Sequence, residues 1–151
     1  MMPFGSSALP TSDSLPSEVL VDTSVAVAIV LADHDGHAET VAAVRGLRLG
    51  LAGHAWFETY SVLTRLPPGS RRSPRDVRAI LEHDFPATRH LDSGALDDLG
   101  RELAQLGIAG GAVYDALIGA AARAQGLPLL SRDRRARPTY DALGVEVHLI
   151  G

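Results

Sequence analysis

Four carboxylates stand in surroundings that suggest chemistry rather than simple solvation: Asp22, Glu58, Asp115 and Asp133. Asp22 and Asp133 follow short apolar runs, directly after Val-Leu-Val and shortly after Leu-Leu-Ser-Arg. Asp115 is the only acid in the small, apolar stretch GGAVYDALIGAAARA, and Glu58 lies in the aromatic stretch HAWFETY. Burying a carboxylate that has no partner costs free energy. Acids at positions that are expected to be buried therefore need an explanation.

Each acid taken alone also has a plain explanation. Asp22 is also explained as a helix cap, since acids that end strands often cap the helix that follows. Glu58 alone is more typical of a solvated helix face, and Asp133 has neighbouring arginines with which to pair. Asp115 favours a functional role because its helix is otherwise so apolar. The hypothesis therefore depends on the four acids converging.

If the four acids converge, their mutual repulsion becomes the informative quantity. Two like charges 4 Å apart cost about 4 kcal/mol at an effective dielectric near 20. A hard divalent cation relieves that repulsion, and ligation by oxygen alone favours Mg²⁺, with Mn²⁺ as a plausible substitute, over zinc. Such a site activates water and stabilises charge that develops on a phosphodiester. The sequence leaves open whether one metal ion or two are used.

The elements that must position these acids alternate along the chain. The pattern predicts helices at 23–33, 37–46, 54–66, 73–85, 93–107, 110–126 and within 134–144, with Thr23 and Ser24 capping the first. It predicts strands at 18–22, 49–53, 88–91, 127–131 and 145–150. Strands separated by helices indicate an α/β fold, a three-layer α/β/α sandwich with a central parallel sheet. Sites in such sheets form beyond the carboxyl ends of the strands, where Asp22 and Asp133 lie.

Composition narrows the class further. The 151 residues fit one domain at 18–151, and residues 1–17, rich in Ser, Pro and Gly, are expected to be a flexible leader. With no Cys the chain suits a reducing, cytoplasmic compartment, and no apolar run reaches the roughly 18 residues of a membrane span. The net charge of −4 argues against binding nucleic acid through the overall field. A polyanionic substrate must be held by local groups or by bound metal.

The motifs around the four acids resemble those of PIN-domain toxins of type II toxin–antitoxin pairs, the VapC family. They are VLVDTSV, AWFETYSVLTRLP, GGAVYDALIGAAA and LLSRDRRARPTY, and the resemblance covers 18–151. It implies a Mg²⁺-dependent endoribonuclease with a PIN-like fold, commonly dimeric, that a cognate VapB-like antitoxin neutralises. Asp22 and Asp115 match the principal metal ligands, and Glu58 and Asp133 the other two acids. The leader is longer than such toxins usually carry, which puts the translation start in doubt.

The resemblance also suggests supporting residues. Ser24 matches a small hydroxyl residue that supports the first acid, and Ser131 is expected to act similarly. Arg132, Arg134 and Arg135 are candidates for binding RNA phosphates, with a solvated basic loop as the equal alternative. The face formed by Trp56, Tyr60 and Leu63 is interpreted as core or antitoxin contact rather than as base-stacking groups.

Three other classes compete with this interpretation. A haloacid-type phosphatase also begins with an acid at a strand end, but it needs a second acid where this chain has Ser24. A response-regulator receiver domain needs a lysine, and all 14 cationic side chains here are Arg. The main alternative is a catalytically silent PIN scaffold that acts as a binding module, and the presence of all four acids argues against it.

Overall fold

The computed structural model describes residues 15–151, so most of the predicted leader lies outside the described residues. Four parallel strands form one sheet in the order β2-β1-β3-β4. They are β1 (Glu18–Val21), β2 (Arg48–Leu51), β3 (Leu129–Ser131) and β4 (Val147–Leu149). Strand β1 is central, and its residues Val19 to Val21 are fully buried, as expected of a parallel sheet covered on both faces.

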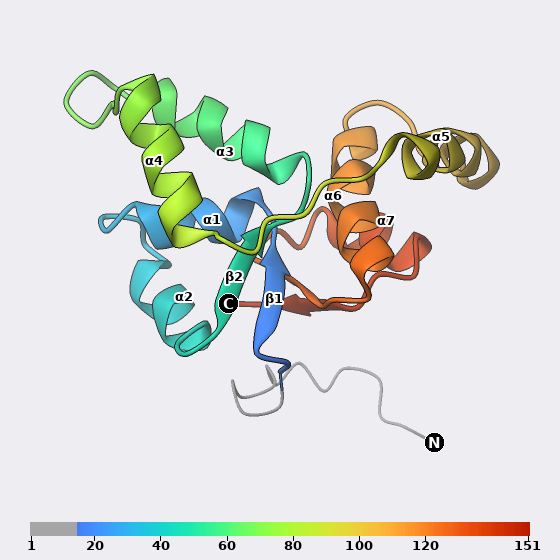
Figure 1. The fold of residues 1–151 in the computed structure, drawn as a ribbon, viewed down its shortest axis with the longest axis horizontal. Coiled ribbons are helices and arrows are strands. Elements are labelled where there is room, and N and C mark those ends of the chain that lie inside the picture. Colours follow the sequence, from blue (N-terminus) through green and yellow to red (C-terminus); the bar gives the residue numbers. More distant parts are fainter. Residues whose placement is uncertain (1–14) are drawn as a thin grey trace.

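Seven helices cover this sheet within the described part of the chain. Figure 1 shows four on one side of the sheet: α1 (Thr23–Val30), α2 (His37–Ala43), α3 (Ala55–Thr64) and α4 (Pro74–Asp84). The other side carries α5 (Ser93–Leu106), α6 (Ala112–Gln125) and α7 (Arg137–Ala142). The prediction of a three-layer α/β/α sandwich is confirmed. Among residues 15–151, no helix combines the length and the apolar character that a bilayer crossing requires.

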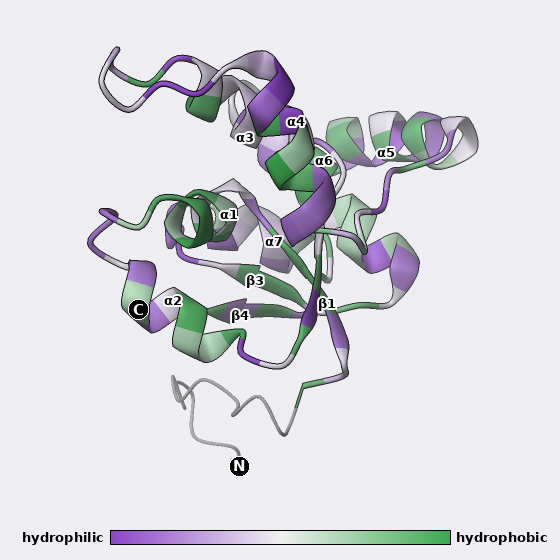
Figure 2. Ribbon diagram, turned by 60° about the vertical axis from the view of Figure 1, so that its left-hand side comes forward, coloured by the Kyte–Doolittle hydropathy of each residue, from purple (hydrophilic) through white to green (hydrophobic). Residues whose placement is uncertain are grey.

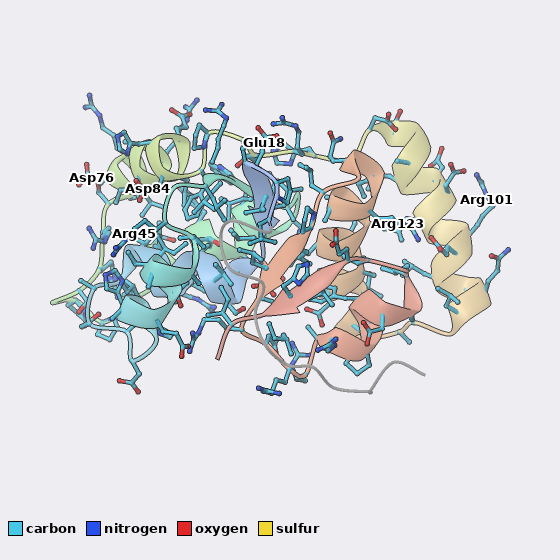
Figure 3. The ribbon with its side chains drawn as sticks, turned by 90° about the horizontal axis from the view of Figure 1, so that it is seen from below. Glu18, Arg45, Asp76, Asp84, Arg101 and Arg123 are labelled. Atoms are coloured by element: carbon cyan, nitrogen blue, oxygen red, sulfur yellow. The ribbon has the colours of Figure 1, made fainter. Side chains whose placement is uncertain are left out.

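The helices differ in how completely they are buried, and this follows from their sequences. Figure 2 shows α1 as hydrophobic over most of its length, whereas α5 alternates hydrophobic and hydrophilic residues. Only Leu99 of α5 is fully buried. In Figure 3 Arg123 of α6 lies toward α5, while Arg101 projects outward from α5. The Arg123 guanidinium donates to both carboxylate oxygens of Glu102, at 2.9 and 2.7 Å, and this pair ties α5 to α6.

The prediction of a fifth strand at 88–91 is wrong. This segment forms only isolated bridges beside β2, at Gly50–Pro86 and Ala52–Arg89. The ladder is interrupted because the Leu51 N–H donates to the Thr88 hydroxyl (2.9 Å) instead of to a backbone carbonyl. Gly50 permits the close approach, since a Cβ atom there would lie 2.1 Å from the Ala87 carbonyl oxygen.

The capping prediction for the first helix is also wrong. Asp22, rather than Thr23 or Ser24, is the N-cap of α1, and its carboxylate accepts from the Val25 N–H at 3.2 Å. The two hydroxyl residues are the first residues of the helix, and their side chains are engaged by carboxylates. The explanation of Asp22 as a cap is therefore correct, although it does not exhaust the contacts of this side chain.

Candidate active site

The four acids meet at the carboxyl end of the sheet. Together they line one pocket of about 330 Å³, between the α1 and α3 side and the α6 and α7 side of the molecule. The pocket is completed by Thr23, Ser24, Gly111, Tyr114, Ile118, Arg135 and Tyr140. The convergence on which the sequence argument depended is thus a feature of the fold.

Asp22 is the most buried of the four, with 3% of its surface exposed. Its Oδ1 accepts from the Ser24 hydroxyl at 2.5 Å as well as from the α1 backbone. Its Oδ2 accepts from the Ser131 hydroxyl at 2.5 Å and from the Tyr140 hydroxyl at 3.0 Å. Burial raises the pKa of Asp22, and the hydrogen bonds from Ser131, Ser24, Val25 and Tyr140 oppose that rise.

Tyr140 reaches this carboxylate because α6 is small where α7 crosses it. A Cβ atom on Gly119 would lie 2.9 Å from the Tyr140 ring, so only glycine leaves room for the ring at that point. The tyrosine is itself buried, and burial, with the charge of Asp22 next in size, raises its pKa far above the ordinary range. Tyr140 therefore stays protonated and acts as a fixed donor to Asp22.

Asp115 enters the pocket from the first turn of α6, where it is 8% exposed. Burial is the main cause of its raised pKa. The charge of Arg135 opposes the rise, while the carboxylates of Asp133 and Glu58 add to it. Mutual repulsion among the acids is therefore present, but for Asp115 it is smaller than the cost of burial.

Arg135 partly neutralises the pocket from its rim. Its guanidinium lies 3.4 Å from Asp115 Oδ2 and donates to Asp133 Oδ2 at 2.9 Å. Both contacts raise the pKa of the arginine, with Asp115 the larger influence. The side chain is 71% exposed, so solvent screens these pairs strongly.

Glu58 and Asp133 are held by short-range contacts of their own. The Thr23 hydroxyl donates to Glu58 Oε2 at 2.7 Å, and His54 Nε2 lies 3.5 Å from Glu58 Oε1. The backbone N–H of Asp133 donates to the Ser131 hydroxyl at 3.0 Å, which links this acid to the Asp22 cluster. Ser131 thus contacts two of the four acids.

The other two candidate arginines are engaged elsewhere. Arg132 donates to Glu39 (2.7 Å) and Thr40 (3.1 Å) of α2, with its side chain only 20% exposed. Its backbone N–H donates to the Ser24 hydroxyl at 2.8 Å. Arg134 donates to the Gly151 carbonyl at 2.8 Å. Of the three arginines, Arg135 is the one that lines the pocket.

The aromatic face of α3, for which the sequence leaves core and antitoxin contact open, packs mainly against the core. Leu63 is fully buried, and Trp56 and Tyr60 are half-buried against the core, with their rings stacked 5.5 Å apart. The sequence did not single out Tyr140, Tyr114 or His54. Their contacts depend on which helices meet at the pocket, and no local pattern records that. The sequence predicts Thr23 as a helix cap and gives no sign of its contact with Glu58.

The PIN-domain family model matches residues 19–141, which contain all four acids. The chain is 46% identical over 127 residues to ribonuclease VapC27 of Mycobacterium tuberculosis, covering 84% of this chain and 93% of that protein. It is 48% identical over 133 residues to ribonuclease VapC40 of the same species, covering 85% and 96%. The chain belongs to the VapC ribonucleases of the PIN-domain family.

Solved structures agree on the fold of this PIN domain. The crystal structure of Mycobacterium tuberculosis VapC20, described as a sarcin–ricin loop cleaving toxin, has a TM-score of 0.63 at 22% identity. It covers 86% of this chain and 98% of its own. VapBC2 from Rickettsia felis, solved on a DNA fragment from its promoter, also gives 0.63, at 13% identity, covering 89% and 99%.

Proposed function

We propose that this PIN domain is a divalent-metal-dependent endoribonuclease toxin that uses Asp22, Glu58, Asp115 and Asp133. The observation that supports the proposal most strongly is that four carboxylates from distant segments line one pocket at the carboxyl end of the sheet. Two of them are buried, and burying a carboxylate costs free energy unless it is paired, hydrogen-bonded or bound to a metal ion. The chemistry proposed is hydrolysis of RNA phosphodiester bonds in the cytoplasm.

The donor set fits a hard cation, because every candidate ligand atom is a carboxylate oxygen, and Mg²⁺ or Mn²⁺ is expected. As the side chains stand, no group of three or more acids or histidines within residues 15–151 is close enough to hold an ion. Asp22 already accepts four hydrogen bonds, about the full capacity of a carboxylate, and Arg135 spans Asp115 and Asp133. Ion binding would therefore require Arg135 to leave Asp115 and one hydroxyl to turn its proton away from Asp22.

The residues of the chain divide the proposed work among them. When bound, the cation supplies an activated water and stabilises charge on the phosphate. Ser24, Ser131 and Tyr140 hold the Asp22 carboxylate in one orientation. Arg135 lies at the rim, and once released from Asp115 its guanidinium has the shape and charge to bind a phosphate through two hydrogen bonds.

The decisive experiment compares parent and Asp22→Asn protein, purified without antitoxin, on total bacterial RNA with mapping of new RNA ends. The parent should cut with Mg²⁺ or Mn²⁺ and stop in EDTA, and Asp22→Asn should lose cleavage. Asp97→Asn, at an exposed acid of α5, is the matched control and should cut normally. Cleavage in EDTA would refute the metal hypothesis, and an active Asp22→Asn would refute the carboxylate site. A parent inert with both metals would favour the silent scaffold.

Membership of the VapC ribonucleases also supports two partners. We propose that a VapB-like antitoxin binds and neutralises this PIN domain, and that the toxin itself is a homodimer. Co-expression with the antitoxin gene should relieve the growth arrest caused by the toxin alone, and light scattering should report twice the chain mass of 15.9 kDa. A monomer mass would contradict the dimer without bearing on cleavage.

A further inference from the structure

A second hollow lies beside the acid pocket. It has a volume of about 190 Å³ and is lined by Gly53, His54, Phe57, His90, Leu91, Leu96 and Leu117. The two hollows share their supporting helices: α3 gives Phe57 to one and Glu58 to the other, and α6 gives Leu117 to one and Asp115 to the other. Figure 1 shows the first turn of α3 close to α6.

Aromatic rings join the two hollows. The His54 ring lies at the second hollow and stacks on Tyr114, which lines the acid pocket, with centroids 5.2 Å apart and planes 23° apart. Phe57 and His90 also line the hollow, with ring centroids 6.2 Å apart and ring planes tilted by 51°. Trp56 contacts Phe57 edge to face, with ring centroids 5.1 Å apart. A ring surface thus runs from the carboxylates into the hollow.

Two of these rings are large, apolar and exposed. Phe57 is 57% exposed and Tyr114 is 52% exposed, and they are among the four large hydrophobic side chains that are exposed within residues 15–151. Large apolar side chains gathered at the surface mark contact sites. None of the residues that line the second hollow is an acid or an arginine. The hollow therefore suits an uncharged, flat, aromatic group.

We propose that this hollow is a nucleobase subsite, in which a base of single-stranded RNA next to the cleaved phosphodiester stacks on Phe57. The inference rests on the proposed function, since the acid pocket positions the phosphate. With a net charge of −4, the chain has little general attraction for RNA, and stacking attracts a base without needing positive charge. His54 and His90 line the hollow, so their ring nitrogens supply polar groups where the edge of a base would lie.

The size of the hollow favours a base over a protein partner. Its 190 Å³ is well below the roughly 300–1,000 Å³ of pockets that enclose drug-sized ligands. A stable protein interface covers about 800 Å² on each partner. A single ring system suits a hollow of this volume. The hollow also adjoins the carboxylates, so a base bound there would lie beside the phosphate site.

The first test is catalytic. Phe57→Ala should lower kcat/KM at the mapped RNA cleavage site by roughly 5- to 100-fold, the range expected for loss of one base–aromatic stack. Leu106→Ala removes a similarly exposed side chain of α5 outside both hollows and should leave the rate unchanged. Phe57→Tyr keeps an aromatic face and should recover most of the loss. Equal rates for Phe57→Ala and parent would overturn the proposal.

The second test does not depend on cleavage. In EDTA, single-stranded RNA oligonucleotides carrying 2-aminopurine at each position in turn are titrated with Asp22→Asn protein, and stacking quenches the fluorescence. Quenching at one position, lost in Asp22→Asn/Phe57→Ala and kept in Asp22→Asn/Leu106→Ala, supports the subsite even if the parent proves not to cut RNA. Absence of any Phe57-dependent quenching overturns the subsite, even if the parent cuts RNA as proposed.

The third test separates the base from a second copy of the chain. Light scattering of parent and Phe57→Ala at the same concentration should give the same mass. If Phe57→Ala instead turns a dimer into a monomer and its lost activity follows the monomer fraction, the exposed rings are an interface between copies, and the nucleobase proposal is overturned.

Discussion

The hydrogen bonding of Asp22 is the feature on which the proposed chemistry depends most closely at the residue scale. Its two oxygens receive four donors, from β3, α7 and the first turn of α1. This arrangement makes the carboxylate rigid, and it offsets part of the cost of burying a charge. The same donors compete with a cation for the lone pairs. The four hydrogen bonds therefore fix the position of the Asp22 carboxylate, but they also make it harder for a cation to bind there.

Asp115 gives a pH-dependent prediction. Because burial raises its folded pKa above the unfolded value, the parent loses stability as pH rises from about 4 through the folded pKa. Asp115→Asn carries no charge and escapes that loss. In EDTA its melting temperature, relative to that of the parent, should therefore be higher at pH 7 than at pH 4, by roughly 2–4 °C for each kcal/mol.

The comparison needs a control and has a clear contrary result. Asp97→Asn, at an exposed acid, should show the same small difference from the parent at both pH values. The contact of Arg135 with Asp115, lost in the Asn variant, works against the expected gain at neutral pH. Parallel melting curves for Asp115→Asn and parent across the pH range would show that this carboxyl is not destabilised by burial.

At the scale of elements, the packing of α6 against α7 decides whether Tyr140 reaches the pocket. We predict that Gly119→Ala forces the Tyr140 ring outward, because the new Cβ would lie 2.9 Å from it. Overpacking of this kind costs about 1–3 kcal/mol, measured as a lower midpoint in urea unfolding. Cleavage should fall as well, since Asp22 loses a donor.

Two variants separate these effects. Tyr140→Phe keeps the ring and removes the hydroxyl, so it should lower cleavage without overpacking α6. Gly100→Ala, at a helical glycine of α5 with no atom within 4 Å of the added Cβ, should not lower the unfolding midpoint. If Gly119→Ala is as stable and as active as the parent, the ring does not need the space that this glycine leaves.

The elements were largely predictable from the sequence, and the exceptions have identifiable causes. Apolar periodicity indicated all seven helices and four strands, because the residues that each element buries recur at regular spacing. Segment 88–91 has strand-like residues, yet the Thr88 side chain takes the place of a backbone acceptor. Convergence of the acids was predictable from strand ends and from an acid on an apolar helix. The contacts of Tyr140 and Arg135 were not, since they depend on distant segments that meet only in the fold.

At the scale of the whole molecule, α5 is attached to the rest by the buried Leu99, the half-buried Leu103 and one ion pair with α6. Arg123 donates to Glu102 and also to the Leu143 carbonyl after α7, at 2.8 Å, so it joins three segments. The hydrogen bond from Arg123 lowers the pKa of Glu102. This stabilisation is therefore present above the unfolded pKa and is lost as pH falls through the folded pKa.

We predict that Glu102→Gln increases hydrogen exchange of the α5 amides at pH 7, and that the difference from the parent shrinks toward pH 3. The pair is partly exposed, so the effect should be about 1 kcal/mol or less. Asp98→Asn is the matched control, because it breaks the exposed Arg101–Asp98 pair within α5 and should leave docking on α6 unchanged. Equal exchange in Glu102→Gln and parent at pH 7 would show that the pair does not hold α5 in place.

The chain beside β2 has a consequence for how the molecule behaves in a crowded solution. An outer strand with free N–H and carbonyl groups is a template on which other chains add and aggregate. Here residues 86–89 lie along that side of β2, so close at Gly50 that no side chain fits between. Residues 86–89 therefore cover the outer edge of β2. Their detachment would expose that edge and would be the first step toward self-association there.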